Sequence, residues 1–152
     1  MIYLASDHRG FELKKKISVW LKEWGYQSED MGPFAYDAED DYPDFVLKAA
    51  EKISADPENS KGIVLGHSGQ GEALVANKYK GIRAIVYYGG PEELITLSRE
   101  HNNANVLSLG ASFLDDETAK KAVKTWLETK FAGEERHVRR IAKIAKIEEN
   151  IR

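Results

Sequence analysis

Short apolar runs alternate along the chain with segments in which apolar residues recur at helical spacing. The run at residues 2–5 leads into a polar turn and then into an amphipathic segment that ends at Gly25. The apolar positions of that segment are Phe11, Leu13, Ile17, Leu21 and Trp24. We expect further strands at 26–30, 62–65, 81–87 and 105–109. Further helices should begin near Pro43, Glu72 and Pro91, and after a cap formed by Asp115 or Asp116.

Five alternations of strand and helix predict an α/β fold. Each crossover helix must pack back on the sheet with right-handed connection, so the sheet is parallel and covered on both faces. The leading arrangement is a three-layer, Rossmann-like fold of the flavodoxin type, with five strands in the order 2-1-3-4-5. The 152 residues are most simply one domain.

An extra helix from about 134 to 152 follows the last strand and carries a stripe of isoleucines. It packs either on its own domain or on a second subunit. The second alternative is slightly favoured, because a helix that crosses no strand often serves an interface.

Composition narrows the classes of function. The formal net charge of -3 gives no electrostatic case for binding nucleic acid or an anionic membrane. The chain has no cysteine, which removes disulfides, thiolate nucleophiles and cysteine-ligated metals. The N-terminal run reaches Asp7 too soon for a signal peptide, and no apolar run approaches transmembrane length. We therefore expect a cytoplasmic protein.

The stretch from Gly62 to Glu72 predicts a strand, a glycine-rich turn and a helix. Such a turn lies at the carboxyl end of a parallel strand, where α/β proteins bind ligands, and its N–H groups suit an anion. His67, Ser68 and Glu72 are the groups there that can exchange protons or hydrogen bonds with a substrate. Alone the turn is a weak signal, since it matches neither the dinucleotide nor the Walker pattern.

Further polar clusters lie near the ends of other expected elements. Asp7 and His8 follow the first strand and share a sheet edge with the glycine-rich turn. Each polar group also has a purely structural explanation: a helix cap for Asp7, the helix dipole for Glu72 and His101, and a solvated face for the arginines. The two remaining clusters are His101, Asn102 and Asn103 before the last strand, and Arg136, His137, Arg139 and Arg140 in the last helix.

These clusters resemble the motifs of the ribose-5-phosphate isomerase B and galactose-6-phosphate isomerase family, in family order and over nearly the whole chain. The resemblance implies a parallel α/β fold and a homodimer or tetramer with active sites shared between subunits. It also implies aldose–ketose isomerisation of sugar phosphates without metal or other cofactor, as in the pentose phosphate pathway. The matching stretches are Ser6 to Lys14, Asp41-Tyr42-Pro43, Gly69-x-Gly71, Ala76-Asn77-Lys78, Gly81-Ile82-Arg83, Arg99 to Asn105, and Arg136-His137-x-x-Arg140.

The resemblance assigns a role to each matching residue. Glu72 is the expected base, His101 the ring-opening group, and Asp7 and Tyr42 lie near the sugar. Ser68 and the turn amides would hold the enediolate oxygens, and His101 and Asn102 would come from the partner subunit. The other expected substrate-binding residues are Gly66, His67, Gly69 and Gly71 in the turn, and His8, Arg136, His137 and Arg140 at the phosphate.

Three positions depart from the family pattern. Many members carry a catalytic cysteine where this chain has Gly66, whereas another branch uses a glutamate that Glu72 matches. The usual phosphate-binding arginine after the last strand is Ser112 here, and Arg9 is a candidate to compensate for it. His67 replaces a residue that is usually small, and it either contacts substrate or lies at the rim of the loop.

Several alternatives therefore stay open. Ribose 5-phosphate is the leading substrate, and a hexose or tetrose phosphate is the second. A sugar-phosphate-binding dimer without turnover is the third, and a generic nucleotide-binding flavodoxin-like domain is a distant fourth. For catalysis, we expect burial of Glu72 beneath the substrate to raise its pKa above the ordinary value of about 4.3.

Overall fold

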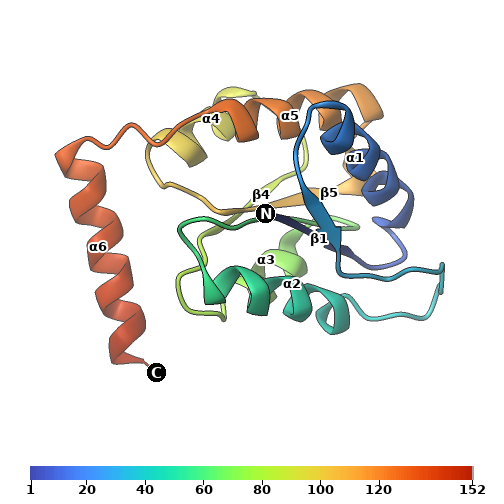
Figure 1. Ribbon diagram of the computed structural model, residues 1–152, viewed down its shortest axis with the longest axis horizontal. Coiled ribbons are helices and arrows are strands. Elements are labelled where there is room, and N and C mark those ends of the chain that lie inside the picture. The colour runs from blue at the N-terminus through green and yellow to red at the C-terminus, as the bar shows by residue number, and fades with distance from the viewer. Residues whose placement is uncertain (152) are drawn as a thin grey trace.

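A five-stranded parallel sheet lies between two layers of helices in the computed structural model, which describes residues 1–151 (Figure 1). This arrangement confirms the predicted α/β class. The strands are β1 (Ile2–Ser6), β2 (Ser28–Asp30), β3 (Lys61–Gly66), β4 (Ala84–Tyr87) and β5 (Val106–Gly110). The helices are α1 (Phe11–Glu23), α2 (Pro43–Ala55), α3 (Gln70–Ala76), α4 (Glu93–Glu100), α5 (Asp116–Glu128) and α6 (Glu135–Asn150), with a 3-10 turn η1 (Ala111–Phe113) after β5.

The strand order is β2-β1-β3-β5-β4, so the predicted order 2-1-3-4-5 is wrong for the last two strands. Every residue of β5 is buried, as expected for a strand with neighbours on both sides. Three of the four residues of β4 are only partly buried, which suits the edge position. The segments that form β4 and β5 are both apolar, so the sequence does not indicate which of the two strands is central.

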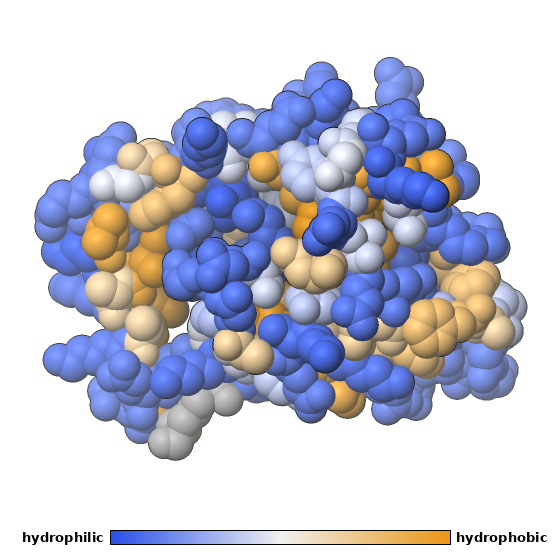
Figure 2. All heavy atoms as spheres, in the orientation of Figure 1, coloured by the Kyte–Doolittle hydropathy of each residue, from blue (hydrophilic) through white to orange (hydrophobic). Residues whose placement is uncertain are grey.

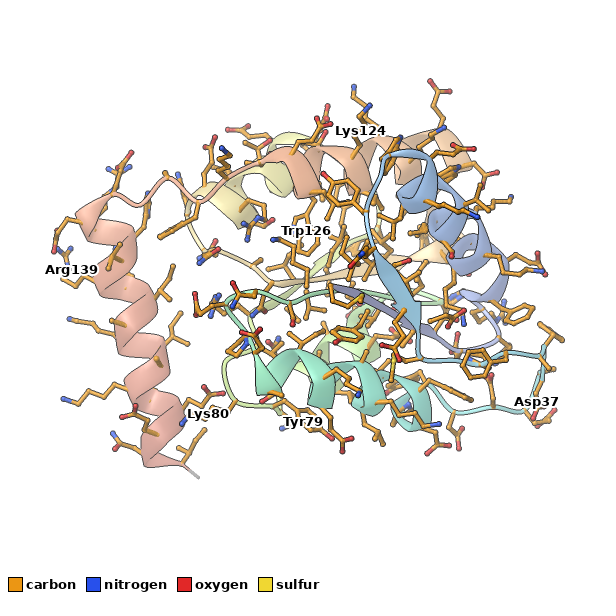
Figure 3. The ribbon with its side chains drawn as sticks, in the orientation of Figure 1. Asp37, Tyr79, Lys80, Lys124, Trp126 and Arg139 are labelled. Carbon is orange, nitrogen blue, oxygen red and sulfur yellow. The ribbon has the colours of Figure 1, made fainter. Side chains whose placement is uncertain are left out.

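The two faces of the sheet carry separate cores, because alternate side chains of each strand point to opposite faces. Leu4, Ile63 and Leu107 pack on one face under α1, α4 and α5, together with Trp126, which is fully buried. Figure 3 shows Trp126 directed from α5 toward the sheet. Val46 and Ile53 of α2 pack on the other face, which α3 also covers.

Local signals fix several element ends where the sequence predicts them. Pro43 is the first residue of α2, and Asp115 caps α5 by accepting a hydrogen bond from the Thr118 N–H at 2.7 Å. Gly69 precedes α3 with φ of +82°, a conformation that favours glycine. Within residues 1–151, no helix combines the length and the apolar character needed to cross a membrane.

Helix α6 stands apart from the three layers at the end of an extended connection (Figure 1). It contacts the rest of the chain near both of its ends: the ring of His137 stacks on that of His101, and the Glu148 Oε2 accepts a hydrogen bond from the Gly81 N–H at 2.9 Å. Its apolar stripe is largely uncovered: Ile144 is 53% exposed and Ile147 is 61% exposed. Figure 2 shows apolar atoms at the surface along this helix. The helix was expected to extend to residue 152, which lies outside the described residues.

Candidate active site

The carboxyl ends of β1, β3 and β5 are level with one another in the sheet. Ser6 pairs with Leu65, and Gly66 pairs with Gly110. The residues that follow these strands therefore meet at one edge, which we call the carboxyl edge. It carries the predicted residues Asp7, His8, Gly66, His67, Ser68, Gly69, Gly71 and Glu72.

Glu72 lies in the first turn of α3 and is 3% exposed. Burial raises the pKa of its carboxyl above the ordinary value; its own backbone N–H opposes that effect, and the charge of Asp7 adds to it. From the sequence we expect Glu72 to become buried only when a substrate covers it. In the structure the protein's own atoms already bury the carboxylate, so a raised pKa does not depend on a bound ligand.

Two glycines leave the room that this arrangement needs. A Cβ atom at Gly66 would overlap the carboxylate of Glu72, so any larger residue there would displace it. A Cβ atom at Gly71 would overlap the ring of Tyr42, which lies against the turn. The absence of a side chain at position 66 and the position of the Glu72 carboxylate are therefore a single structural feature.

Asp40 holds His8 at the same edge. Its Oδ1 accepts hydrogen bonds from the His8 Nδ1 at 2.7 Å and from the His8 backbone N–H at 2.9 Å. A carboxylate only accepts, so the hydrogen-bond pattern assigns a proton to Nδ1 and leaves Nε2 for another partner. Asp7 accepts hydrogen bonds from the N–H groups of Arg9 at 2.8 Å and Gly10 at 3.3 Å, in the turn that precedes α1, and does not cap the helix itself.

Asp7, His8 and Asp40 also offer three ligand atoms within 4.8 Å of one another, the kind of grouping that holds a metal ion. The Asp40 Oδ1, His8 Nδ1 and Asp7 Oδ1 atoms are engaged in the hydrogen bonds described above, whereas the buried Asp40 Oδ2 has no hydrogen-bond partner within the described residues. The arrangement fixes the ring of His8 and the loop that approaches it. We therefore interpret the trio as a positioning network for His8.

Lys14 anchors the loop that carries Asp40 and Tyr42. Its side chain is completely buried, and its Nζ donates to the Asp30 carboxylate and to the Pro33 carbonyl, both at 2.7 Å. Burial lowers the pKa of this lysine, and Asp30 counteracts the shift. The sequence analysis missed both Lys14 and Asp40. The position of Lys14 on the apolar face of the first helix could have indicated that it is buried and paired.

His67 and Ser112, which follow the carboxyl ends of β3 and β5, contact each other. The His67 Nδ1 lies 2.7 Å from the Ser112 Oγ, and the His67 ring packs edge-on against Phe113 with centroids 5.4 Å apart. This pair forms an exposed rim beside the glycine-rich turn. Arg9 is exposed, and within residues 1–151 no carboxylate forms an ion pair with it.

Apart from Tyr42, which lies against the glycine-rich turn, the other predicted site residues lie at the opposite edge of the sheet, which we call the amino edge. His101 ends α4 just before β5, and its ring stacks on His137 of α6 with centroids 4.2 Å apart. His137 is buried, and its pKa is lowered by burial and by the neighbouring His101 and Arg136. The other predicted residues here, all exposed, are Asn102, Arg136 and Arg140.

One chain does not bring the two groups together. The five residues of β5 separate the amino edge from the carboxyl edge, a distance of roughly 16 Å at the usual rise per residue. In Figure 3 the loop with Asp37 and the helix with Arg139 lie at opposite ends of the molecule. A site that uses both groups requires a second chain.

Comparison with known proteins defines the class to which this fold and site belong. A family model described as Ribose/Galactose Isomerase matches residues 2–144. Ribose-5-phosphate isomerase B of Mycolicibacterium paratuberculosis is 44% identical over 147 residues, which cover 97% of this chain and 91% of that protein. The chain therefore belongs to the ribose/galactose isomerase family.

Solved structures agree with this assignment. Ribose-5-phosphate isomerase B from Mycoplasma genitalium, solved with bound ribulose 5-phosphate, superposes with a TM-score of 0.93 at 41% identity and covers 97% of this chain and 95% of its own. The Clostridium thermocellum ribose-5-phosphate isomerase B gives a TM-score of 0.92 at 40% identity, with 99% of both chains covered.

Proposed function

We propose that this protein interconverts ribose 5-phosphate and ribulose 5-phosphate through an enediolate, with Glu72 as the general base. The observation that carries the proposal is the buried Glu72 carboxylate, whose pKa is raised, at the carboxyl edge of a chain in this family. Relatives with more than 40% identity are ribose-5-phosphate isomerases B, and one of them was solved with ribulose 5-phosphate.

The chemistry needs one group that removes a proton from C2 of the open-chain aldose and returns it to C1. A single carboxylate suffices, and a raised pKa makes it a stronger base than an exposed glutamate. Negative charge develops on the substrate oxygens as the proton leaves. Ser68 and the backbone N–H groups of the glycine-rich turn would stabilise that charge.

Ring opening and phosphate binding fall to the remaining residues. His101, with Asn102 beside it, would pass a proton to or from the ring oxygen. His8, held by Asp40, and the α6 residues Arg136, His137 and Arg140 would bind the phosphate, which fixes the reacting carbons against Glu72.

We further propose that the active protein is a homodimer in which each site combines the carboxyl edge of one chain with the amino edge of the other. The separation of the two groups in one chain supports this arrangement. So does the surface of α6: its isoleucines and Ile82 line an open cavity of about 270 Å³ that one chain leaves unfilled. Apolar patches of this kind favour burial against a partner.

The test is a side-by-side assay of ribose 5-phosphate, galactose 6-phosphate and erythrose 4-phosphate in deuterated water. We expect the pentose phosphate to turn over fastest, with solvent deuterium appearing at the carbons between which the proton moves. Faster turnover of the hexose or tetrose phosphate would replace ribose 5-phosphate as the substrate. Thermal stabilisation by ribose 5-phosphate without any exchange would instead indicate a binding protein without turnover.

A further inference from the structure

A small basic pocket lies at the amino edge of the sheet, among residues to which the proposed reaction assigns no role. Lys61 begins β3, Arg83 precedes β4, and Arg99 reaches the same place from α4. Their side chains line a cavity of about 50 Å³ together with Glu58, Asn103 and Asn105. The strand register brings these segments together, because β5 pairs with β3 on one side and with β4 on the other.

Among the residues that the structure describes, the three cations have no anionic partner in direct contact. Arg99 donates to Asn103 Oδ1 at 3.0 Å and to the Ala104 and Thr129 carbonyls. Arg83 donates to the Asn103 carbonyl at 2.8 Å and to the Gly81 carbonyl at 3.3 Å. All of these acceptors are neutral. Within residues 1–151, none of Lys61, Arg83 and Arg99 forms an ion pair.

Burial makes the close approach of these three positive charges energetically unfavourable. It lowers the pKa of Lys61, Arg83 and Arg99, and the charge of Arg99 lowers that of Lys61 further. Glu58 and Glu148 oppose the shift at Arg83 from beyond ion-pair distance. Three positive side chains and one carboxylate line the cavity, so a bound anion would relieve the repulsion among the cations.

We propose that this amino-edge pocket is a binding site for a tetrahedral oxyanion, namely phosphate. Arginine and lysine are the residues that recognise phosphate oxygens, and a cavity of about 50 Å³ suits an ion of a few atoms and is too small for a nucleotide. The pocket uses none of the residues assigned to the substrate phosphate. Asn103 contacts both arginines and continues the turn that carries His101 and Asn102, so the bound ion would brace that turn.

The experiment titrates inorganic phosphate into the full-length protein by calorimetry at constant ionic strength. Lys61→Gln tests the pocket, because this side chain is partly exposed and its loss leaves the hydrogen bonds of both arginines intact. We expect Lys61→Gln to weaken one class of phosphate binding by about tenfold or more, the usual effect of losing a charged hydrogen bond. Lys61→Arg should restore it, and Lys22→Gln, at an exposed position on α1, should leave it unchanged.

Backbone amide resonances locate the ion in the same titration. Phosphate should shift the signals of residues 61, 103 and 105 in the wild type and not in Lys61→Gln. Titration with glycerol 2-phosphate distinguishes the source of the phosphate, because an ester that binds equally well shows that the pocket accepts phosphomonoesters. Identical phosphate binding by wild type and Lys61→Gln, with no shift at these residues, would overturn the proposal.

The readout is independent of turnover. If the protein does not isomerise ribose 5-phosphate, phosphate binding should still depend on Lys61. If the pocket does not bind phosphate, the isomerase assay in phosphate-free buffer should give the same result as before. The two failures can therefore be told apart.

Discussion

The two edges of the sheet differ in how far a single chain completes them. At the carboxyl edge, the fold buries Glu72, fits its carboxylate into the space above Gly66 and fixes His8 through Asp40. At the amino edge, Asn102 and Arg140 are exposed. One chain thus buries the expected base, whereas among the expected groups at the amino edge only His137 is buried.

The difference indicates that, in the proposed dimer, folding of one chain prepares the group for proton transfer, whereas association of two chains completes substrate binding. Proton transfer depends on a preorganised, poorly solvated carboxylate, which packing within one chain supplies. Substrate capture benefits from groups that close around a ligand from a second surface. Variants of each edge should therefore differ in their effect on chemistry, on stability and on complementation between subunits.

Replacement of the base should give the largest effect. Glu72→Gln keeps the shape of the side chain and removes its ability to take a proton, so we expect kcat to fall by about 10²–10⁴-fold. The measurement is ribulose 5-phosphate formation together with exchange at C2. Near-normal turnover by a folded Glu72→Gln protein would contradict the assignment of the base.

The same variant should be more stable than the wild type near neutral pH. The folded-state pKa of Glu72 is raised, so ionisation costs stability as the pH rises through the ordinary carboxyl pKa toward the folded value. Glutamine removes that cost. The melting temperature should rise by roughly 2–4 °C per kcal/mol gained, with the difference disappearing below about pH 4. A lower melting temperature at pH 7 would show that the charge is well solvated.

Mixing subunits tests whether the two edges meet across a dimer. Glu72→Gln and His101→Asn proteins, each nearly inactive, are unfolded and refolded together to form mixed dimers. A shared site then has one intact combination per mixed dimer, so the mixture should recover about one quarter of wild-type activity. A double variant mixed with wild type serves as the control for random assortment. No recovery would show that each site is built within one chain.

Gly66→Ala should give a smaller loss that originates in packing. The added Cβ displaces the Glu72 carboxylate, and a shift of about 1 Å at a reacting group can lower kcat by about 10²-fold. Addition of Gly66→Ala to a Glu72→Ala protein should cost no further stability, because the clash is then absent. Equal destabilisation in both backgrounds would place the strain elsewhere.

Much of the fold could be predicted because its signals are local. Pro43 at the start of α2, Asp115 at the cap of α5 and the apolar periodicity of α1 each act within a few residues. The order of the last two strands could not be predicted, because it depends on which apolar run gains a neighbour on each side. That choice rests on long-range packing of β5 between β3 and β4.

The candidate site divides in the same way. The strand-end rule predicted that Asp7, His8 and Glu72 share an edge, because parallel strands end level. The role of Asp40 could not be predicted, because it is one of several acidic residues in a loop. It contacts His8 only in the folded chain, where Lys14 of α1 holds that loop in place. The burial of Glu72 depends on the space left at Gly66, a contact that a linear sequence does not display.

The raised pKa of Glu72 should also appear in the pH dependence of kcat/KM, as a smaller effect than those of the substitutions above. The base must be ionised to act, so activity should rise with pH through a midpoint above the ordinary glutamate value of about 4.3. Rates across pH 4 to 8 with ribose 5-phosphate measure the midpoint, and the Gly66→Ala variant, in which the carboxylate is pushed from its buried position, should move it. An acidic midpoint at or below the ordinary value would contradict a buried base.

Ser112→Ala should give the smallest change and should separate the rim from the base. The variant removes the hydroxyl that holds His67 at 2.7 Å and leaves the packing of His67 on Phe113 in place. Because these groups are exposed at the rim of the turn and take no part in the proposed proton transfer, we expect KM to rise by about two- to tenfold, the effect of losing one hydrogen bond, with kcat nearly unchanged. His67→Ala should have the same effect, and the double variant should cost no more than either single one. A fall in kcat comparable to that of Gly66→Ala would instead mean that the rim holds the turn on which Glu72 depends.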